Sequence, residues 1–148
     1  MKVILGADHR GFELKQQLKK YLEENQYEVI EVGSKELIET DDYPDVALKA
    51  ATEVLKNEGS KGIVICGSGV GVCVTANKVK GIRSGLGMKA EQIQSAREHD
   101  DINVLALASD YTDEKTAQEL VKTFLTTSFD GKESHARRIN KISAIEQV

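Results

Sequence analysis

Short apolar runs rich in β-branched residues alternate along this chain with longer segments whose apolar residues recur at helical spacing. The runs predict five strands, at residues 3–7, 27–32, 62–66, 82–86 and 102–108. The spacing predicts helices at residues 12–22, 46–55, 70–79, 89–97, 113–124 and 134–146. Strands joined by such helices form a parallel sheet covered on both faces. We therefore predict an α/β fold, a three-layer, doubly wound, Rossmann-like sandwich with a five-stranded parallel sheet of order 2-1-3-4-5.

The composition fits one domain over residues 1–148, since 40% of the residues are hydrophobic and a chain of this length buries most of its apolar surface. A net charge of −4 and the absence of Trp argue against a nucleic-acid surface. No apolar run is long enough to cross a membrane. Two cysteines form neither a disulfide framework nor a four-ligand zinc set, and the chain opens on a strand without a signal peptide. These features predict a cytoplasmic protein.

The third predicted strand ends at Cys66 and runs into the glycine-rich segment Gly-Ser-Gly-Val-Gly, residues 67–71. In doubly wound folds, ligands bind beyond the carboxyl ends of the strands, near strands 1 and 3. Glycine lets backbone N–H groups approach a ligand closely, and thiols beside such donors tend toward the thiolate. A thiolate there can take a proton from a substrate while the amides stabilise the resulting oxyanion. The segment thus indicates an enzyme, although Cys66 as a small core residue is an open alternative.

A nucleotide site is the main competing interpretation of this segment. The third glycine comes one residue early for the G-x-G-x-x-G fingerprint, and the turn follows the third strand instead of the first. The next predicted strand ends without an acidic residue for a ribose, and the G-x-x-x-x-G-K-[ST] phosphate loop is missing. Dinucleotide and flavin binding are therefore disfavoured.

Polar residues capable of acid–base chemistry stand near the ends of other predicted strands. Asp8 and His9 follow strand 1, and His99 precedes strand 5. Each could be a helix cap or a solvated side chain, but together they indicate a site. The segment 41–45 is compatible with a turn and a helix cap, and its Tyr43 is a candidate for the pocket lining.

Two motifs, Cys-Gly-Ser-Gly-Val-Gly at 66–71 and Ala-Asn-Lys at 76–78, occur here in that order. Further matches are Gly-Ala-Asp-His at 6–9, Asp-Tyr-Pro-Asp at 42–45, Gly-Ile-Arg at 81–83, Arg-Glu-His at 97–99, Asn-Val-Leu-Ala at 103–106 and His-x-x-Arg at 135–138. Through these motifs the chain resembles, over nearly its whole length, the ribose-5-phosphate isomerase B family, which also contains the galactose-6-phosphate isomerase subunits.

The resemblance implies an aldose–ketose isomerase of the pentose phosphate pathway that uses neither a metal nor a cofactor. Its substrate would be a small sugar phosphate, most like ribose 5-phosphate converted to ribulose 5-phosphate through a cis-enediolate. Cys66 would be the base that moves the proton, and Ser68 would assist transfer between the oxygens. His99, with Asp8, would promote ring opening.

The resemblance also implies the residues that bind the substrate and the partner that completes the site. His9 and Arg138 would contact the phosphate, and the amides from Gly67 to Gly71 would hold the enediolate oxygen. Family members are homodimers, or dimers of dimers, in which the C-terminal helix, about 134–146 here, reaches the partner subunit. The predicted substrate-binding residues are His9, Tyr43, Gly67, Gly69, Val70, Gly71, Asp100, His135 and Arg138.

The chain departs from the family pattern at the phosphate end. Asp100, Asp110 and Ser134 stand where relatives usually carry Asn, Arg and Arg. Charge-assisted bonds to phosphate are stronger than neutral ones, so the missing arginines predict weakened phosphate docking. Two alternatives follow: an isomerase of a different or unphosphorylated sugar, or a non-catalytic subunit of a two-protein isomerase.

Overall fold

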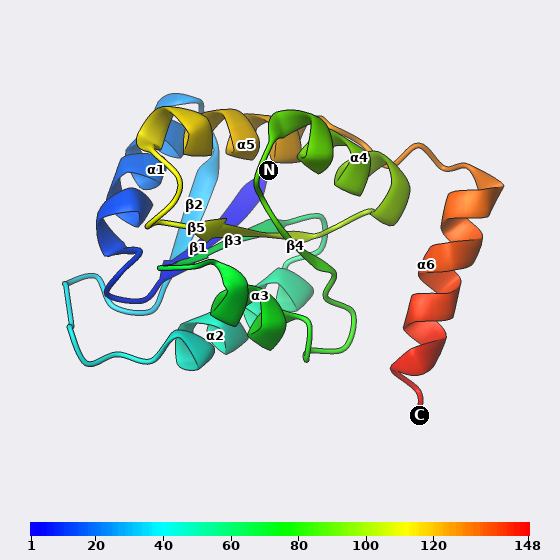
Figure 1. Cartoon of the computed structure of the whole chain (residues 1–148), viewed down its shortest axis with the longest axis horizontal. Helices are drawn as coiled ribbons and strands as arrows, with labels where there is room; N and C mark the ends of the chain where they lie inside the picture. The colour runs from blue at the N-terminus through cyan, green and yellow to red at the C-terminus, as the bar shows by residue number, and fades with distance from the viewer.

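The computed structural model describes residues 1–148 as five strands and six helices around one parallel sheet (Figure 1). The strands are β1 (Lys2–Ala7), β2 (Glu28–Val32), β3 (Lys61–Cys66), β4 (Ser84–Leu86) and β5 (Val104–Ala108). The helices are α1 (Phe12–Glu24), α2 (Tyr43–Lys56), α3 (Val70–Ala76), α4 (Ala90–Asp100), α5 (Glu114–Thr126) and α6 (Glu133–Ile145). The predicted doubly wound α/β sandwich is confirmed. No helix has the length and apolar character of a membrane span.

Successive side chains of the central strands point alternately into two separate hydrophobic cores, one on each face of the sheet. In β3, Ile63 and Ile65 face the core formed with α1, α4 and α5, while Val64 and Cys66 face the core formed with α2 and α3. Figure 1 shows the same division, with α1, α5 and α4 above the sheet and α2 and α3 below it. The alternation therefore directs Cys66 toward the α2–α3 side.

The predicted order of the last two strands is wrong, because the sheet runs β2-β1-β3-β5-β4. Every residue of β5 is buried, as expected for a strand covered on both faces and paired on both edges. β4 has only three residues, each partly exposed, which suits an edge strand. The uninterrupted apolar run of β5 was the signal that it belongs inside the sheet.

The helix predicted at 70–79 ends early, because α3 stops at Ala76. The Asn77 carboxamide then pairs with the backbone of Ser84, donating to its carbonyl at 2.9 Å and accepting its N–H at 2.8 Å. These two bonds mimic a strand pairing and stabilise the turn that leads into β4. Asn77 thus has a structural role in this chain.

A buried ion pair joins α1 to β2. The fully buried Lys15 ammonium lies 2.8 Å from one carboxylate oxygen of Glu31, and Lys19 donates to the other at 2.8 Å. Lys15 also donates to the Ser34 carbonyl at 2.7 Å. Although burial alone would raise the pKa of Glu31, its bonds to the two lysines lower it from 4.5 to about 2. The carboxylate therefore stays ionised inside the fold.

Helix α6 stands apart from the three layers and has no buried residue. It lies at the end of the molecule opposite the loop that joins β2 to α2 (Figure 1). Within the chain it packs against α4, and the Glu146 carboxylate just after it accepts the Gly81 N–H at 3.0 Å. Most of the surface of α6 is thus left without a partner in its own chain.

Candidate active site

A cleft of about 580 Å³ opens at the carboxyl edge of the sheet, between the ends of β1 and β3. The turn after β1, the loop before α2 and the glycine-rich segment after β3 form its walls. Three loops far apart in sequence meet here because neighbouring parallel strands end at the same edge. The lining residues are Asp8, His9, Arg10, Asp41, Asp42, Tyr43, Cys66, Gly67, Ser68, Val70, Gly71 and Val74.

Cys66 lies at the base of this cleft, where β3 ends. It is only 4% exposed and packs in the core formed with α2 and α3, yet it is also one of the residues that line the cleft. Cys73, the second free thiol, lies on α3 outside the lining. Of the two thiols, only that of Cys66 belongs to a residue that lines the cleft.

The glycine-rich segment after Cys66 carries free backbone donors. The N–H groups of Gly67, Ser68 and Gly69 donate to no group within the chain, while the Val70 N–H donates to the Ser68 hydroxyl at 3.2 Å. Gly67 and Gly69 are buried, and buried N–H groups almost always have a partner. Unpaired donors beside a thiol therefore indicate a site for an oxygen that carries negative charge.

Two of the glycines are required by their surroundings. Gly69 has φ 72°, and a Cβ there would lie 2.9 Å from the Leu107 carbonyl carbon. A Cβ on Gly71 would lie 2.6 Å from the ring of Tyr43. Glycine at 71 therefore lets the Tyr43 ring pack against the start of α3, where Tyr43 is one of the residues that line the cleft.

Asp8 and His9 enter the cleft from the turn after β1. The Asp8 carboxylate accepts the N–H groups of Arg10 and Gly11 at 3.0 and 3.1 Å, so it also shapes the turn into α1. Asp41 accepts the His9 backbone N–H at 2.8 Å and lies 2.9 Å from the ring nitrogen Nδ1. This hydrogen bond raises the pKa of His9 above 6.5, against the effect of burial, and nearby Asp8 adds to the rise.

Arg10 and Asp110 form an ion pair beside the glycine-rich segment. Asp110 follows β5, and its backbone N–H donates to the Gly67 carbonyl at 3.0 Å. The hydroxyl of Ser109 donates to the Arg10 carbonyl at 2.9 Å. The loops after β1 and β5 are therefore tied together at the edge of the cleft.

His99, predicted to act with Asp8, lies in the last turn of α4, at the amino edge of the sheet. Cys66 pairs with Ala108 at the other end of β5, so about 13 Å of strand separates the two edges. The structure therefore does not bring His99 to the Asp8 and Cys66 of its own chain. The combination predicted from sequence is split between two ends of the molecule.

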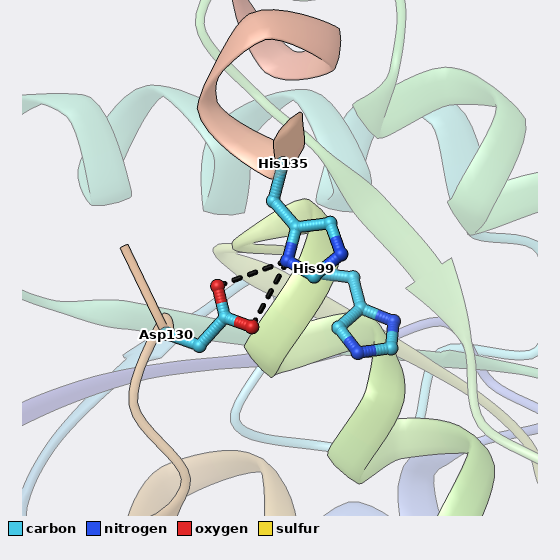
Figure 2. Close-up of side chains that lie close together, drawn as sticks. All are labelled: His99, Asp130 and His135. Atoms are coloured by element: carbon cyan, nitrogen blue, oxygen red, sulfur yellow. Dashed lines mark hydrogen bonds and ion pairs between the residues drawn. The ribbon is translucent and has the colours of Figure 1, made fainter. Parts of the chain in front are cut away.

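Around His99 a second polar cluster forms, drawn in Figure 2. The His99 and His135 rings stack with centroids 4.3 Å apart, and both oxygens of Asp130 lie 2.9 Å from His135 Nδ1. This hydrogen bond lowers the pKa of Asp130 below 3.8. One ligand atom from each residue lies within 4.8 Å of the others, so these three residues could together hold a metal ion. Both oxygens of the Asp130 carboxylate already contact His135 and orient its ring.

The other predicted residues on this side lie outside the cleft. Asp100 ends α4 with an exposed side chain, and its carbonyl accepts from the Arg83 guanidinium at 2.9 Å. Arg138 is exposed on α6, next to Arg137, which pairs with Glu133. A single chain therefore presents two separate sets of polar groups, one in the cleft and one around His99.

Sequence reasoning missed three carboxylates of these sets. The sequence predicts a turn and a helix cap around Asp41, but in the structure its carboxylate lies 2.9 Å from His9 Nδ1, 32 residues away. Asp130 and Asp110 were not considered as partners of His135 and Arg10. The pairs of Asp41 with His9 and of Asp110 with Arg10 depend on how distant loops meet. Asp130 lies only five residues before His135, so this short spacing was a signal that the sequence did offer.

Residues 3–142 match the ribose/galactose isomerase family. The probable ribose-5-phosphate isomerase B of Mycoplasma pneumoniae is 42% identical, over 98% of this chain and 95% of that protein. A putative sugar phosphate isomerase of Bacillus subtilis is 40% identical, over 99% and 98%.

Solved structures are similar over the same length. Ribose-5-phosphate isomerase B of Clostridium thermocellum superposes with a TM-score of 0.95 and 41% identity, over 99% of this chain and 98% of that one. The Mycoplasma genitalium enzyme, solved with bound ribulose-5-phosphate, gives 0.93 and 39%, over 99% and 96%.

Proposed function

Because this chain belongs to the ribose/galactose isomerase family, we propose that its cleft interconverts ribose 5-phosphate and ribulose 5-phosphate by thiol-based proton transfer. It is an aldose–ketose isomerase, and its family supports a role in the pentose phosphate pathway. The observation that carries the proposed mechanism is that Cys66 lines the cleft directly beside backbone N–H groups without a partner in the chain.

In this mechanism the Cys66 thiolate removes the proton from C2 of the open-chain aldose. The electron pair of that C–H bond forms the C1–C2 double bond, and the carbonyl pair moves onto the C1 oxygen. The free amides of residues 67–69 stabilise this oxyanion in the transition state. Ser68 assists the proton shift from the C2 oxygen to the C1 oxygen, and Cys66 returns its proton to C1. Base, donors and hydroxyl all come from one short segment.

The test compares Cys66→Ala with a matched control, Cys73→Ala, which removes the thiol outside the cleft. Isomerisation of ribose 5-phosphate is followed by ribulose 5-phosphate formation, and exchange at C2 by NMR in D₂O. Cys66→Ala is expected to lose about 10²- to 10⁴-fold in kcat, the usual contribution of a positioned base, whereas Cys73→Ala keeps its activity.

The outcomes separate the alternatives that the sequence leaves open. Full turnover by Cys66→Ala would remove this thiol from the mechanism. Reaction of a free sugar, with no reaction of any four-, five- or six-carbon sugar phosphate, would favour an unphosphorylated substrate. Failure of every sugar, with no C2 exchange, would favour a non-catalytic subunit.

The split of functional groups supports an active homodimer. His99, His135 and Arg138 cannot reach the cleft of their own chain, but a partner subunit could bring its copies there. Val70 and Val74, 51% and 53% exposed at the cleft, offer an apolar surface for such contact. In this assembly His99 of one subunit opens the sugar ring in the cleft of the other.

Complementation between inactive variants tests this arrangement. Cys66→Ala and His99→Ala homodimers are each expected to be nearly inactive. After the two are unfolded and refolded together, about a quarter of wild-type activity should return, since about half of the dimers are mixed and each has one intact site. If the mixture stays inactive although it assembles as a dimer, both residues act within one chain and this assignment is wrong.

We also propose a cytoplasmic location. Both cysteines are free thiols, which suits a reducing compartment. Fractionation of the source cells, with immunodetection of the chain, distinguishes this location from a secreted or envelope-bound one.

A further inference from the structure

Among the charged side chains that line the cleft, carboxylates outnumber the Lys and Arg side chains. Asp8, Asp41 and Asp42 contribute carboxylates, and Arg10 is the only Lys or Arg among the lining residues. His9 is paired with Asp41, which partly offsets the charge of its imidazolium. A phosphate dianion would meet net repulsion here without a strong cation, because like charges in a cleft destabilise bound anions. Arg10 is therefore the group within the chain best suited to hold it.

The position of Arg10 fits this task. Its guanidinium lies against the glycine-rich segment, because a Cβ on Gly67 would overlap it. The Arg10 side chain is 56% exposed, so a ligand can reach it. Its backbone is fixed as well, since the Arg10 N–H donates to Asp8 and its carbonyl accepts from Ser109. The Arg10 guanidinium is thus held beside the glycine-rich segment that follows Cys66.

We propose that Arg10 binds the phosphate of the substrate and that Asp110, bonded to the same guanidinium, weakens this binding. This inference rests on the proposed function and names the group that gives it a preference for phosphorylated sugars. It also accounts for Asp110, which stands where the family resemblance predicts an arginine: the positive charge comes from the loop after β1 instead of the loop after β5.

The geometry of the guanidinium allows both partners at once. It carries five N–H donors in a planar fork, and Asp110 is bonded to the terminal nitrogen Nη2. The remaining donors can form charge-assisted bonds to phosphate oxygens, which are about twice as strong as neutral ones. Asp110 also places a negative charge near the phosphate, so its presence lowers the affinity of the cleft for that group.

The two members of the ion pair should therefore respond in opposite directions. Arg10→Ala is expected to raise KM for ribose 5-phosphate about 10- to 100-fold, as for a lost hydrogen bond to a charged group, with a smaller change in kcat. Asp110→Ala is expected to lower KM by up to about tenfold, because it removes a repelling charge. The double variant Arg10→Ala/Asp110→Arg should recover part of the lost affinity.

Lys20→Ala is the matched control, since it removes the cation of an exposed ion pair on α1, outside the cleft. Its KM should stay at the wild-type value. Calorimetry measures the affinity for inorganic phosphate without turnover. It therefore tests whether Arg10 binds phosphate even if the proposed reaction is wrong. Equal phosphate affinity of wild type and Arg10→Ala overturns the inference, as does a shift of both single variants in the same direction.

Discussion

Glu31 offers the sharpest test of how this fold depends on charge. Its carboxylate is 8% exposed and lies between the ammonium groups of Lys15 and Lys19. Glu31→Gln keeps the shape of the side chain but removes its charge. Lys15, which is fully buried, then lacks the carboxylate that compensates for its burial.

The size of the effect follows from the lowered pKa of Glu31. A fall from 4.5 in the unfolded chain to about 2 in the fold corresponds to about 3 kcal/mol, at about 1.4 kcal/mol for each pH unit. Because the folded pKa is depressed, this stability is fully present above about pH 4.5. It is lost as the pH falls toward about 2.

Urea unfolding followed by circular dichroism measures the expected change. At pH 7, Glu31→Gln should lower the free energy of unfolding by about 3 to 5 kcal/mol, since one partner of a buried ion pair is lost. The difference from wild type should shrink between pH 5 and pH 2. Glu28→Gln, an exposed position on the same strand, is the control and should change little. A Glu31→Gln protein as stable as wild type at pH 7, or a difference independent of pH, would refute the reasoning.

Two further substitutions test the cleft. Gly71→Ala should displace the Tyr43 ring, which lies 2.6 Å from the added Cβ, and lower kcat/KM by roughly tenfold or more while stability changes little; steady-state kinetics beside a thermal melt checks this. The raised pKa of His9 keeps its imidazole charged above pH 6.5, so KM for the sugar phosphate should rise as the pH increases through that pKa. In Asp41→Asn the rise should move toward pH 6.5, and an unmoved KM–pH profile would contradict the assigned pairing.

Local patterns in the sequence predicted the layers of this fold, and short segments carry several residues that line the candidate cleft. The apolar alternation of the strands, the glycines at 67–71 and the thiol of Cys66 are all features of short segments, and the structure brings them together as expected. The turn after β1 follows the same rule, because the edge where parallel strands end is determined by chain direction alone.

What the sequence did not reveal depends on geometry between distant segments. The order of β4 and β5 rests on which strand is buried on both faces, and a three-residue strand gives little signal. The position of His99 could have been inferred from the direction of α4, since a crossover helix returns to the amino edge before the next strand begins. Arg10 and Asp110 are 100 residues apart, so no sequence motif predicts that they form a pair.

The isolation of α6 has a consequence for how assembly can be observed. A helix without buried residues unfolds locally at little cost, so its amide hydrogens in a lone chain should exchange with solvent far faster than those of β3 or β5. If a second copy covers α6, the same amides become protected while the sheet is unchanged. Hydrogen exchange of this one helix therefore reports association directly, at any protein concentration and without substrate.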